Sequence, residues 1–337
     1  MPWWLEEAPP DPPAAALAHD LEVDVAIVGG GYCGLWTALA LRARDADLRI
    51  ALVEAARVGH GPSGRNGGFL HGYWSSLPSL RGALGDERAL TVARASTGAV
   101  TAVRALGEDV WLREAGLLKV SAAPAQDGAV AASLLAAREL GEPDEAVPLS
   151  REEVAARIAT AVFRDGVFFR DGATVQPARL VRTLRRAAVA AGVDVYERTP
   201  ATRVREGQVE TPDATIRARE VVLAVNSAAT HWRPLSRRLT NFGSYVVLTE
   251  PVPDLLREIG WTGGEAVVDA RMFLHYFRTT EDGRVVMGSG SGGRAPRSGR
   301  STSGRRDHSS SAPSASDARH CAASHVGPTP FPEKPAA

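Results

Sequence analysis

The feature that most constrains this chain is a change of hydrophobic period in "VAIVGGGYCGLWTALAL", from Val25 to Leu41. Residues 23–28 contain a short β-branched run, as a buried parallel strand does. From Leu35 onward the apolar residues recur at helical spacing, and a cluster of glycines separates the two patterns. A transmembrane helix needs about 20 mostly apolar residues, whereas this run is shorter and is interrupted by the glycines. The segment therefore predicts a strand, a tight turn and a helix.

The glycines have the spacing Gly29-x-Gly31-x-x-Gly34, which is typical of dinucleotide-binding turns. Gly29 permits the tight turn, Gly31 lets the backbone approach a pyrophosphate, and Gly34 lets the helix pack close to the strand. The free N–H groups and the positive dipole end of the helix then face the anion. An ordinary strand and helix with a chance glycine cluster is the alternative.

A second short apolar strand, residues 50–53, ends at Glu54. This glutamate follows Gly34 by about 20 residues, where an acidic side chain can hydrogen-bond a ribose hydroxyl. Its charge disfavours a ribose 2′-phosphate by repulsion. The strand and the glutamate strengthen the nucleotide interpretation, but the motif alone does not distinguish FAD from NAD.

The chain has 337 residues and a formal net charge of zero. The length favours a two-domain α/β protein, and the charge gives no reason to expect nucleic acid or an anionic membrane as a partner. The two cysteines, Cys33 and Cys321, do not suggest a disulfide framework, so we expect a cytoplasmic protein. The start, "MPWWLEEAPPDPPAAA", lacks the basic residues and apolar core of a signal peptide. We expect residues 1–20 to form an extended arm, with Trp3 and Trp4 packed on the body of the protein.

Several later segments carry helical signals. Residues 86–107 have apolar positions at helical spacing, and Ser150 with Glu153 forms a capping-box pattern. The clearest helix has Pro177 near its first turn and ends at Gly192. We expect its arginines to form a solvated face, with a binding patch as the alternative: these are Arg179, Arg182, Arg185 and Arg186. A buried strand is expected at residues 221–225.

Residues 242–287 are rich in strand patterns and predict a second domain with a mostly antiparallel sheet. Its aromatic residues could line a pocket, with ordinary core packing as the alternative: Phe242, Tyr245, Phe273, Tyr276 and Phe277. Residues 294–337 are rich in Ser, Arg, Pro and Ala and have few large apolar side chains. Such a segment cannot bury enough surface to offset the entropy of ordering, so we expect it to be disordered.

With these pieces in order, the chain resembles the D-amino-acid-oxidase-type (DAO) FAD-dependent oxidoreductases, and among them the gamma-glutamylputrescine-oxidase-like branch. Four stretches within residues 3–290 carry the resemblance: "DVAIVGGGYCGLWTALAL" with Glu54, "GPSGRNGGFL", "TPATRV" with "EVVLAVNSAA", and "FRTTEDGRVVMGSG". Dinucleotide motifs are common, but the second and fourth stretches together are not. That combination favours FAD over NAD.

The resemblance implies an α/β fold with two domains. One is a Rossmann-like FAD-binding domain of the glutathione-reductase type, expected to comprise residues 21–108 and 172–233. The other is an α+β substrate domain on a mostly antiparallel sheet, expected to comprise residues 109–171 and 234–293.

The resemblance also implies the cofactor-binding residues. FAD would lie on the first glycine motif with Glu54, and the backbone at Val204 would meet its adenine. Ala224 lies in the matching strand "EVVLAVNS" and is a further expected contact. The loop that approaches the pyrophosphate and the flavin ring would consist of Ser63, Gly64, Arg65, Asn66, Gly67 and Gly68.

The implied reaction transfers a hydride to the flavin from the carbon that bears an amine, in an amine or amino-acid substrate. The imine hydrolyses, and oxygen or another acceptor reoxidises the flavin. The candidate catalytic residues are His71, Tyr245 and Arg278. His71 could face the ring or pack within its loop, and Arg278 could bind a substrate carboxylate or form a structural salt bridge. No cluster has metal-ligand spacing, and neither cysteine suits a covalent link to flavin.

The chain departs from the family after the "GSG" hairpin, where members normally continue with a segment that returns to the FAD domain. We expect a frameshift or truncation of the gene here; an evolved tail is the alternative, and sequencing the locus would decide. Two other functions stay open. One is a different FAD-dependent reductase or hydroxylase, which NAD(P)H consumption would favour. The other is a non-enzymatic family member with weak or no FAD binding.

Overall fold

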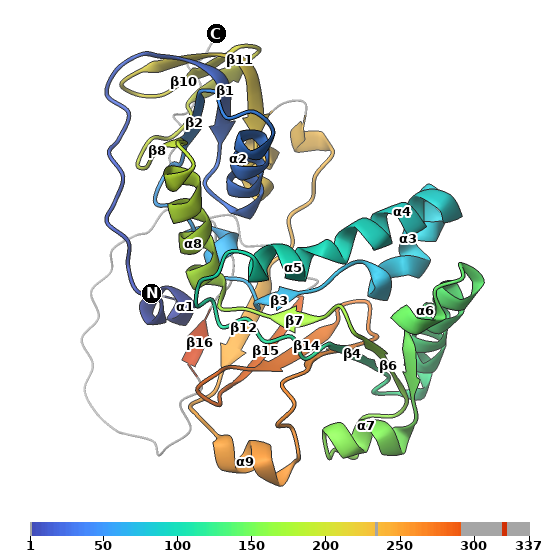
Figure 1. Cartoon of the computed structure of the whole chain (residues 1–337). Coiled ribbons are helices and arrows are strands. Elements are labelled where there is room, and N and C mark those ends of the chain that lie inside the picture. The colour runs from blue at the N-terminus through green and yellow to red at the C-terminus, as the bar shows by residue number, and fades with distance from the viewer. Residues whose placement is uncertain (1, 233–234, 291–318, 322–337) are drawn as a thin grey trace, which may run out of the picture.

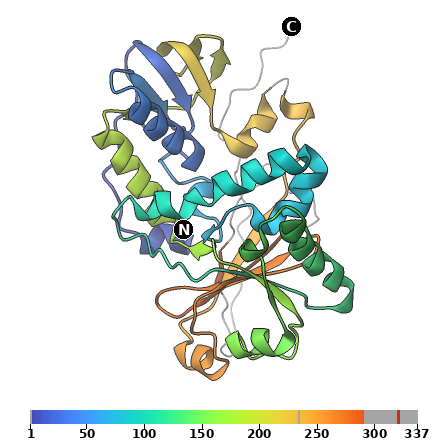
Figure 2. The same ribbon diagram turned by 45° about the vertical axis from the view of Figure 1, so that its right-hand side comes forward.

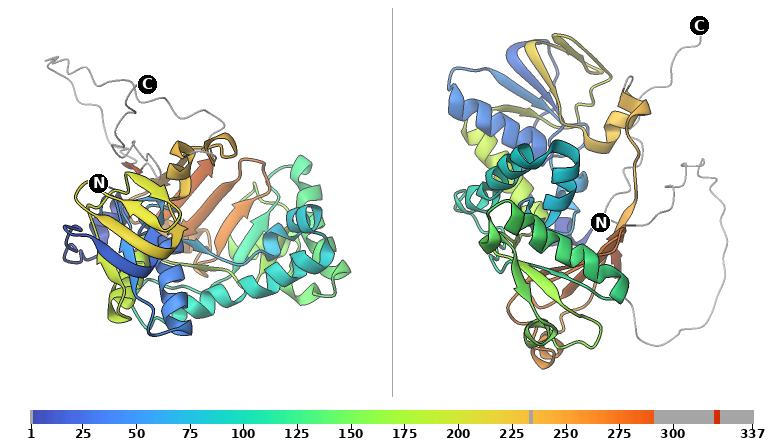
Figure 3. Two further views of the ribbon diagram at one scale, coloured as in Figure 1. Left: turned by 90° about the horizontal axis from the view of Figure 1, so that it is seen from above. Right: turned by 90° about the vertical axis from the view of Figure 1, so that its right-hand side faces the viewer.

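A computed structural model describes residues 2–232, 235–290 and 319–321 of the chain. The described part has an α/β fold built on two large sheets, which lie one above the other in Figure 1 and in the right-hand view of Figure 3. The strands of the first sheet follow in spatial order: β8 (Asp194–Tyr196), β2 (Ile50–Val53), β1 (Leu21–Val28), β11 (Thr215–Leu223), β10 (Gln208–Glu210) and β9 (Arg203–Arg205).

The central strands of the first sheet are parallel, and β9 and β10 extend it in antiparallel fashion. Helices α2 (Tyr32–Arg44) and α8 (Pro177–Ala190) pack on this sheet through a shared core that includes Ile27, Leu52 and Leu184. The sequence signals for α8 are confirmed, because Pro177 is its first residue and Gly192 follows its end with φ of +82°.

The second sheet is mostly antiparallel, with one parallel pair between β13 and β4. Its order is β16 (Arg319–Cys321), β12 (Ser244–Leu248), β15 (Val285–Gly290), β14 (His275–Thr279), β13 (Ala266–Asp269), β4 (Leu117–Val120), β6 (Gly166–Phe169) and β5 (Val147–Leu149). A small two-stranded sheet pairs β3 (Phe69–Leu70) with β7 (Ala173–Thr174).

The remaining α-helices of the described residues are α1 (Trp3–Glu7), α3 (Leu77–Leu84), α4 (Asp86–Ser96), α5 (Gly98–Arg104), α6 (Asp127–Glu139), α7 (Arg151–Arg157) and α9 (Pro253–Glu258). Residues of α3, α4 and α6 share one core with β4 and β6, and residues of α7 share another with β4 and β13. Figure 2 shows α4 in teal and α6 in green beside this sheet. The second sheet is therefore covered by different helices from the first.

Two local predictions need correction, and one is confirmed. Residues 86–107, expected to form one helix, contain two: α4 ends at Ser96, and α5 begins at Gly98 after Thr97. The strand expected to be buried at residues 221–225 ends at Leu223, which is 42% exposed. Beyond Arg217 only β1 pairs with β11, so this end of the strand has an open edge in the described part. The capping box of Ser150 and Glu153 is present at the start of α7.

The N-terminal arm, residues 2–20, packs on the body of the protein as predicted for its tryptophans: Trp4 is 3% exposed and packs with Val246 and Val286 of the second sheet. The first residues are helical rather than extended, since they form α1. Figure 1 shows the arm running from α1 beside α8 to the first sheet.

The expectation of a solvated arginine face on α8 is wrong, because these arginines bind the arm. Arg179 pairs with Glu7 at 2.5 Å, and Arg186 pairs with Asp11 at 3.1 Å. Arg182 and Arg185 donate to the carbonyl oxygens of Pro9 and Pro12, at 2.8 and 3.0 Å. Local helical periodicity shows which face is polar but carries no information about a partner more than 160 residues away in the chain.

The segment expected to be disordered, residues 294–337, lies outside the described residues except for β16. These three residues pair with β12, so they form a strand where disorder was expected.

Candidate functional site

A cavity of about 590 Å³ opens at the carboxyl ends of the parallel strands β1, β2 and β11. This is the edge of an open α/β sheet where ligands bind. The cavity is lined by residues 28–33, 53–56, 59–63, 65, 199, 201 and 223–228. It therefore combines the glycine motif with Glu54, the loop after β2 and the end of β11.

A side chain would collide with the backbone at two of the motif glycines and with a rotatable hydroxyl at the third. A Cβ atom on Gly29, which has φ of +113°, would lie 2.4 Å from the carbonyl oxygen of Ala224. A Cβ atom on Gly34 would lie 2.1 Å from the carbonyl oxygen of Gly29, and one on Gly31 would lie 2.8 Å from Ser63 Oγ. The backbone consequently forms the floor of the cavity at this turn, as a nucleotide cradle requires.

The N-terminus of α2 meets the loop that follows β2. Ser63 lies in a short 3-10 turn, Pro62–Gly64, and its Oγ accepts the backbone N–H of Tyr32 at 3.0 Å. The first turn of α2 carries no acidic side chain of its own beside the positive end of the helix dipole. Tyr32 and Ser63 both line the cavity, which makes this end of it suitable for an anion.

Glu54 lines the same cavity with a fixed carboxylate. Its Oε2 accepts the N–H of Gly30 at 2.8 Å, and its Oε1 accepts the N–H of Ala56 at 3.0 Å. Burial raises the pKa of Glu54, while these two backbone donors oppose that shift. The carboxylate thus joins the glycine turn to the end of β2 and retains further lone pairs for a ribose hydroxyl.

Several lining residues were not identified from the sequence. Thr199 and Ala201 follow β8, and Asn226 follows β11 with φ of +46°, a left-handed conformation in which asparagine is enriched. His60 also lines the cavity, and burial together with the charge of Arg57 lowers its pKa. The available signals were the two stretches of the family resemblance that contain them, "TPATRV" for Thr199 and Ala201 and "EVVLAVNSAA" for Asn226.

The predicted flavin loop, residues 63–68, is fixed by the side chain of Asn66. Its Nδ2 donates to the carbonyl oxygens of Pro62 and Ser63 at 3.2 and 2.9 Å, and its Oδ1 accepts the N–H of Gly68 at 2.8 Å. Ser63 and Arg65 line the cavity, whereas Gly64, Asn66, Gly67 and Gly68 lie outside its lining. Among the residues expected to meet the adenine side, Ala224 lines the cavity and Val204, on β9, does not.

The second half of the loop packs against β14 of the second sheet. A Cβ atom on Gly67 would lie 2.8 Å from the ring of Tyr276, and one on Gly68 would lie 3.1 Å from the guanidinium of Arg278. The backbone of Gly68 has φ of +73°, so only glycine fits there without strain. Tyr276 and Arg278 therefore share the face of the sheet that is turned toward this loop.

The structure does not bring His71, Tyr245 and Arg278 together. Tyr245 is 47% exposed. It lies opposite Ser289 of β15 in the sheet register, and Ser289 lies opposite His275 of β14, so these three side chains share one face. Tyr276 and Arg278 are one and three positions beyond His275 and therefore lie on the other face. His71 is exposed after β3, with its Nδ1 2.8 Å from the carbonyl oxygen of Gly72.

Arg278 is fully buried rather than open to solvent, with 2% of its surface exposed. Its guanidinium lies 4.9 Å from the ring of Trp4, and its Nη1 donates to the carbonyl oxygen of Gly68 at 3.4 Å. Its Nε and Nη2 have no hydrogen-bond partner among the described residues. Burial lowers the pKa of Arg278 to about 9.

Tyr276 is the residue on this face that the sequence analysis did not select for catalysis. Its ring meets that of Phe69 edge-on at 5.3 Å, and its hydroxyl lies 3.1 Å from Ser244 Oγ. Burial raises the pKa of Tyr276. The choice between Tyr245 and Tyr276 depends on strand register, which the sequence pattern did not provide.

Within the described ranges, no helix is both long and apolar enough to cross a membrane. The same residues contain no group of three or more His, Cys, Asp or Glu side chains arranged to hold a metal ion.

Comparison with known proteins gives a family match over most of the chain. The family described as FAD dependent oxidoreductase, abbreviated DAO, matches residues 24–328. This range runs past residue 290, where the sequence analysis placed the end of the resemblance. "Probable oxidoreductase OrdL" of Rhizobium meliloti (strain 1021) is 29% identical over 302 residues, which cover 85% of this chain and 68% of the relative. "Gamma-glutamylputrescine oxidoreductase" of Escherichia coli (strain K12) is 26% identical over 291 residues, covering 82% of this chain and 67% of the relative.

Solved structures share the fold. Glycine oxidase from Geobacillus kaustophilus matches with a TM-score of 0.60 at 23% identity, over 80% of this chain and 72% of that one. L-amino acid deaminase from Proteus vulgaris matches with a TM-score of 0.61 at 19% identity, over 82% of this chain and 63% of that one.

Proposed function

This chain belongs to the DAO family of FAD-dependent oxidoreductases, and we propose on that premise that it oxidises an amine or an amino acid with FAD bound in the cavity at the end of β1. The observation that carries the proposal is the glycine cradle beneath this cavity, where a side chain would meet the backbone at Gly29 and Gly34 and the Ser63 hydroxyl at Gly31. The names of two similar proteins, a gamma-glutamylputrescine oxidoreductase and a glycine oxidase, support the class of substrate.

The residues of the cavity fit FAD by their chemistry. The N-terminus of α2 would hold the pyrophosphate, with the hydroxyl hydrogen of Ser63 as a donor, since the oxygen of that hydroxyl already accepts the N–H of Tyr32. The carboxylate of Glu54 would accept a hydrogen bond from a ribose hydroxyl. Thr199, which follows β8, would enclose the nucleotide end together with Ala224 and Asn226, which follow β11.

The substrate would lie between the flavin loop and the second sheet, on the face that carries Tyr276. We assign Tyr276, rather than Tyr245, the role of orienting the substrate through its hydroxyl, because only Tyr276 packs against Gly67 of the loop. Arg278 supplies a buried positive charge beside Gly68; a direct pair with a substrate carboxylate requires that its unpartnered Nε or Nη2 be reached.

When bound, FAD would supply a two-electron acceptor for the hydride that leaves the carbon beside the substrate nitrogen, and the nitrogen would lose a proton. The protein contributes binding, orientation and exclusion of water. The oxidised substrate is an imine, which water hydrolyses to a carbonyl compound and ammonia or an amine. Reoxidation of the cofactor would require oxygen or another electron acceptor.

The test is to supply the purified chain with FAD and measure hydrogen peroxide with polyamines and amino acids as substrates. Because the acceptor can be a molecule other than oxygen, reduction of an artificial acceptor dye is measured in parallel. Turnover with an amine or amino acid supports the proposal. Turnover only with NAD(P)H, or no turnover with a chain that has bound FAD, contradicts it.

A further inference from the structure

The N-terminal arm is joined to a segment of the cavity wall by a buried carboxylate, that of Glu197. This residue follows β8 and is 2% exposed. Its Oε2 accepts the N–H of Ala14 in the arm at 2.9 Å. A second hydrogen bond joins the same two segments: the backbone N–H of Glu197 donates to the carbonyl oxygen of Ala15 at 3.2 Å. Glu197 therefore fastens the arm to the edge of the first sheet.

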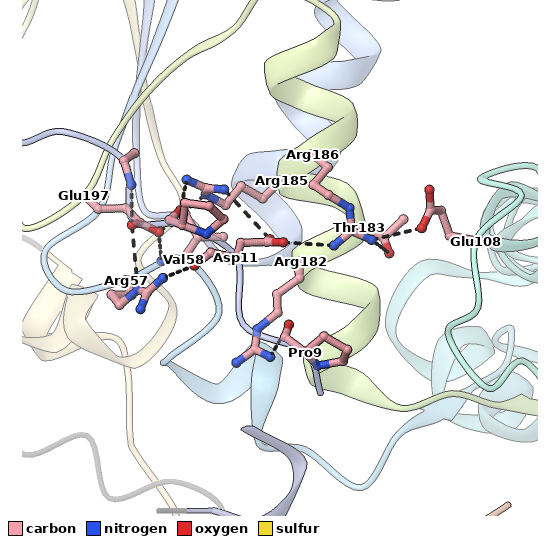
Figure 4. Close-up of polar contacts among 12 residues, drawn as sticks. Pro9, Asp11, Arg57, Val58, Glu108, Arg182, Thr183, Arg185, Arg186 and Glu197 are labelled. Atoms are coloured by element: carbon pink, nitrogen blue, oxygen red, sulfur yellow. Dashed lines mark hydrogen bonds and ion pairs between the residues drawn. The ribbon is translucent and has the colours of Figure 1, made fainter. Parts of the chain in front are cut away.

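The same carboxylate also fixes the segment that lines the cavity. Its Oε1 accepts the N–H of Val58 at 2.9 Å, as Figure 4 shows. Val58 lies between Ala56 and Gly59, and both of these line the cavity. Residues 56–61 have no regular secondary structure to hold their shape apart from turns. A buried acceptor for the central N–H is consequently one of the contacts that define this part of the cavity wall.

Two guanidinium groups balance the charge of Glu197. Arg57 Nε lies 3.8 Å from Oε2, and Arg185 Nε of α8 lies 3.5 Å from Oε1. Arg57 also donates to the carbonyl oxygen of Asp11 at 2.6 Å, so the arm, the cavity segment and α8 meet at one charged cluster (Figure 4). A buried carboxylate is stable only with such partners, and removal of its charge leaves the cations without compensation.

We propose that Glu197 is a positioning residue for the cofactor, which holds residues 56–61 against the N-terminal arm in the shape that receives the nucleotide end of FAD. The inference rests on the proposed function only in that FAD is taken as the occupant of the cavity. Its consequence is a coupling: binding of FAD stabilises the contact of the arm with Glu197, and loss of that contact weakens binding.

The matched control is Glu7, which ties the arm to α8 at a site away from residues 56–61. Its carboxylate pairs with Arg179 and accepts from Gln176 Nε2 at 2.6 Å. Glu197→Gln and Glu7→Gln each remove one charge that binds the arm. Only the first alters a contact with the cavity wall.

The experiment titrates FAD into the full-length chain and its two variants and follows the quenching of flavin fluorescence. Glu197→Gln is expected to raise the Kd for FAD about tenfold, because an amide oxygen can replace only one of the two carboxylate acceptors. Glu7→Gln is expected to lower the urea midpoint of the FAD-free protein while leaving the Kd within about twofold. An unchanged Kd in Glu197→Gln, or an equal loss in both variants, overturns the inference.

A second measurement covers the case in which Glu197→Gln does not fold. Amide hydrogen exchange of the wild-type chain is followed with and without FAD, in peptides that contain Ala14 or Val58. FAD is expected to slow exchange in both peptides, and unchanged exchange in the Ala14 peptide overturns the coupling. If the wild type binds FAD but oxidises no amine, only the proposed function fails; if it binds no FAD, both fail.

Discussion

The side-chain oxygen of Ser63 lies 3.0 Å from the backbone nitrogen of Tyr32, so the loop after β2 caps the first turn of α2. Two segments that are 31 positions apart thereby form one wall of the cavity. The contact has the character of a helix N-cap, although its acceptor comes from a distant residue rather than from the position before the helix.

Removal of this hydroxyl tests the contact directly. Ser63→Ala is expected to lower the free energy of unfolding of the FAD-free chain by about 1 kcal/mol, the usual cost of a lost N-cap. Urea unfolding followed by circular dichroism measures the change. Ser76→Ala is the control, because the side chain of Ser76 precedes α3 without a capping hydrogen bond. If both variants lower the free energy of unfolding equally, the hydrogen bond from Tyr32 to Ser63 does not stabilise the fold.

The motif glycines are expected to separate binding from folding. In Gly31→Ala the new methyl group meets the Ser63 hydroxyl, which can rotate away, so FAD binding weakens while the fold survives. In Gly34→Ala the methyl group meets the carbonyl oxygen of Gly29, which is backbone, so the free energy of unfolding falls by about 1–3 kcal/mol. The FAD Kd and the urea midpoint of each variant are measured.

The control for the glycine variants is Gly82→Ala on α3, where an added methyl group meets nothing within 4 Å. It is expected to leave the FAD Kd unchanged and to raise stability slightly, because alanine is the better helix former. If Gly31→Ala binds FAD as tightly as the wild type does, Gly31 is not part of the cofactor site.

The half-buried carboxyl group of Glu54 predicts a pH dependence of the free energy of unfolding. Burial raises its pKa above the ordinary value of 4.5, so the folded state binds this proton more tightly than the unfolded state. The resulting stabilisation is fully present below pH 4.5 and is lost as the pH rises through the raised pKa. Relative to the wild type, Glu54→Gln therefore gains stability as the pH is raised from 4.5 through that range.

Urea unfolding of the FAD-free proteins, in steps from pH 4.5 to about pH 8, measures this difference. Gln offers only one of the two acceptors that Gly30 and Ala56 need, which lowers stability by an amount that does not vary with pH. Glu281→Gln, at an exposed turn, reports the general effect of losing a carboxylate. A constant difference between the wild type and Glu54→Gln across this range would contradict the raised pKa.

The two tyrosines on opposite faces of the second sheet give a matched pair. Tyr276→Phe keeps the ring contact with Phe69 but loses the hydroxyl, so kcat/KM for the amine substrate is expected to fall about tenfold with the FAD Kd unchanged. Tyr245→Phe is expected to leave both unchanged. A loss of activity confined to Tyr245→Phe would place the substrate on the other face.

The elements with local sequence signals were predictable. The glycine spacing of residues 29–34 and the strand that ends at Glu54 identified one wall of the cavity. Pro177 and Gly192 marked the limits of α8 to within two residues, because proline and glycine act on the backbone at their own positions. The family followed from four stretches of resemblance, and FAD rather than NAD from "GPSGRNGGFL" together with "FRTTEDGRVVMGSG"; both are confirmed by the family match.

The parts that were not predictable depend on contacts distant in sequence. The arm binds α8 through Arg182 and Arg185, and nothing in the helix pattern distinguishes such arginines from solvated ones. Which of Tyr245 and Tyr276 faces the loop depends on the face that each strand turns inward, and a shift of one residue reverses that choice. The burial of Arg278 beneath Trp4 likewise joins residues from opposite ends of the chain.

The central claim is that FAD binds in the cavity above the glycine turn. The most direct test is the visible absorbance spectrum of the purified chain after addition of FAD and removal of the unbound cofactor, compared with Gly31→Val, whose larger side chain would enter the space of Ser63 Oγ. We predict a flavin spectrum in the wild type and its loss in a Gly31→Val variant that remains folded by circular dichroism. A folded wild type that stays colourless, or a variant that retains the flavin, would contradict the account.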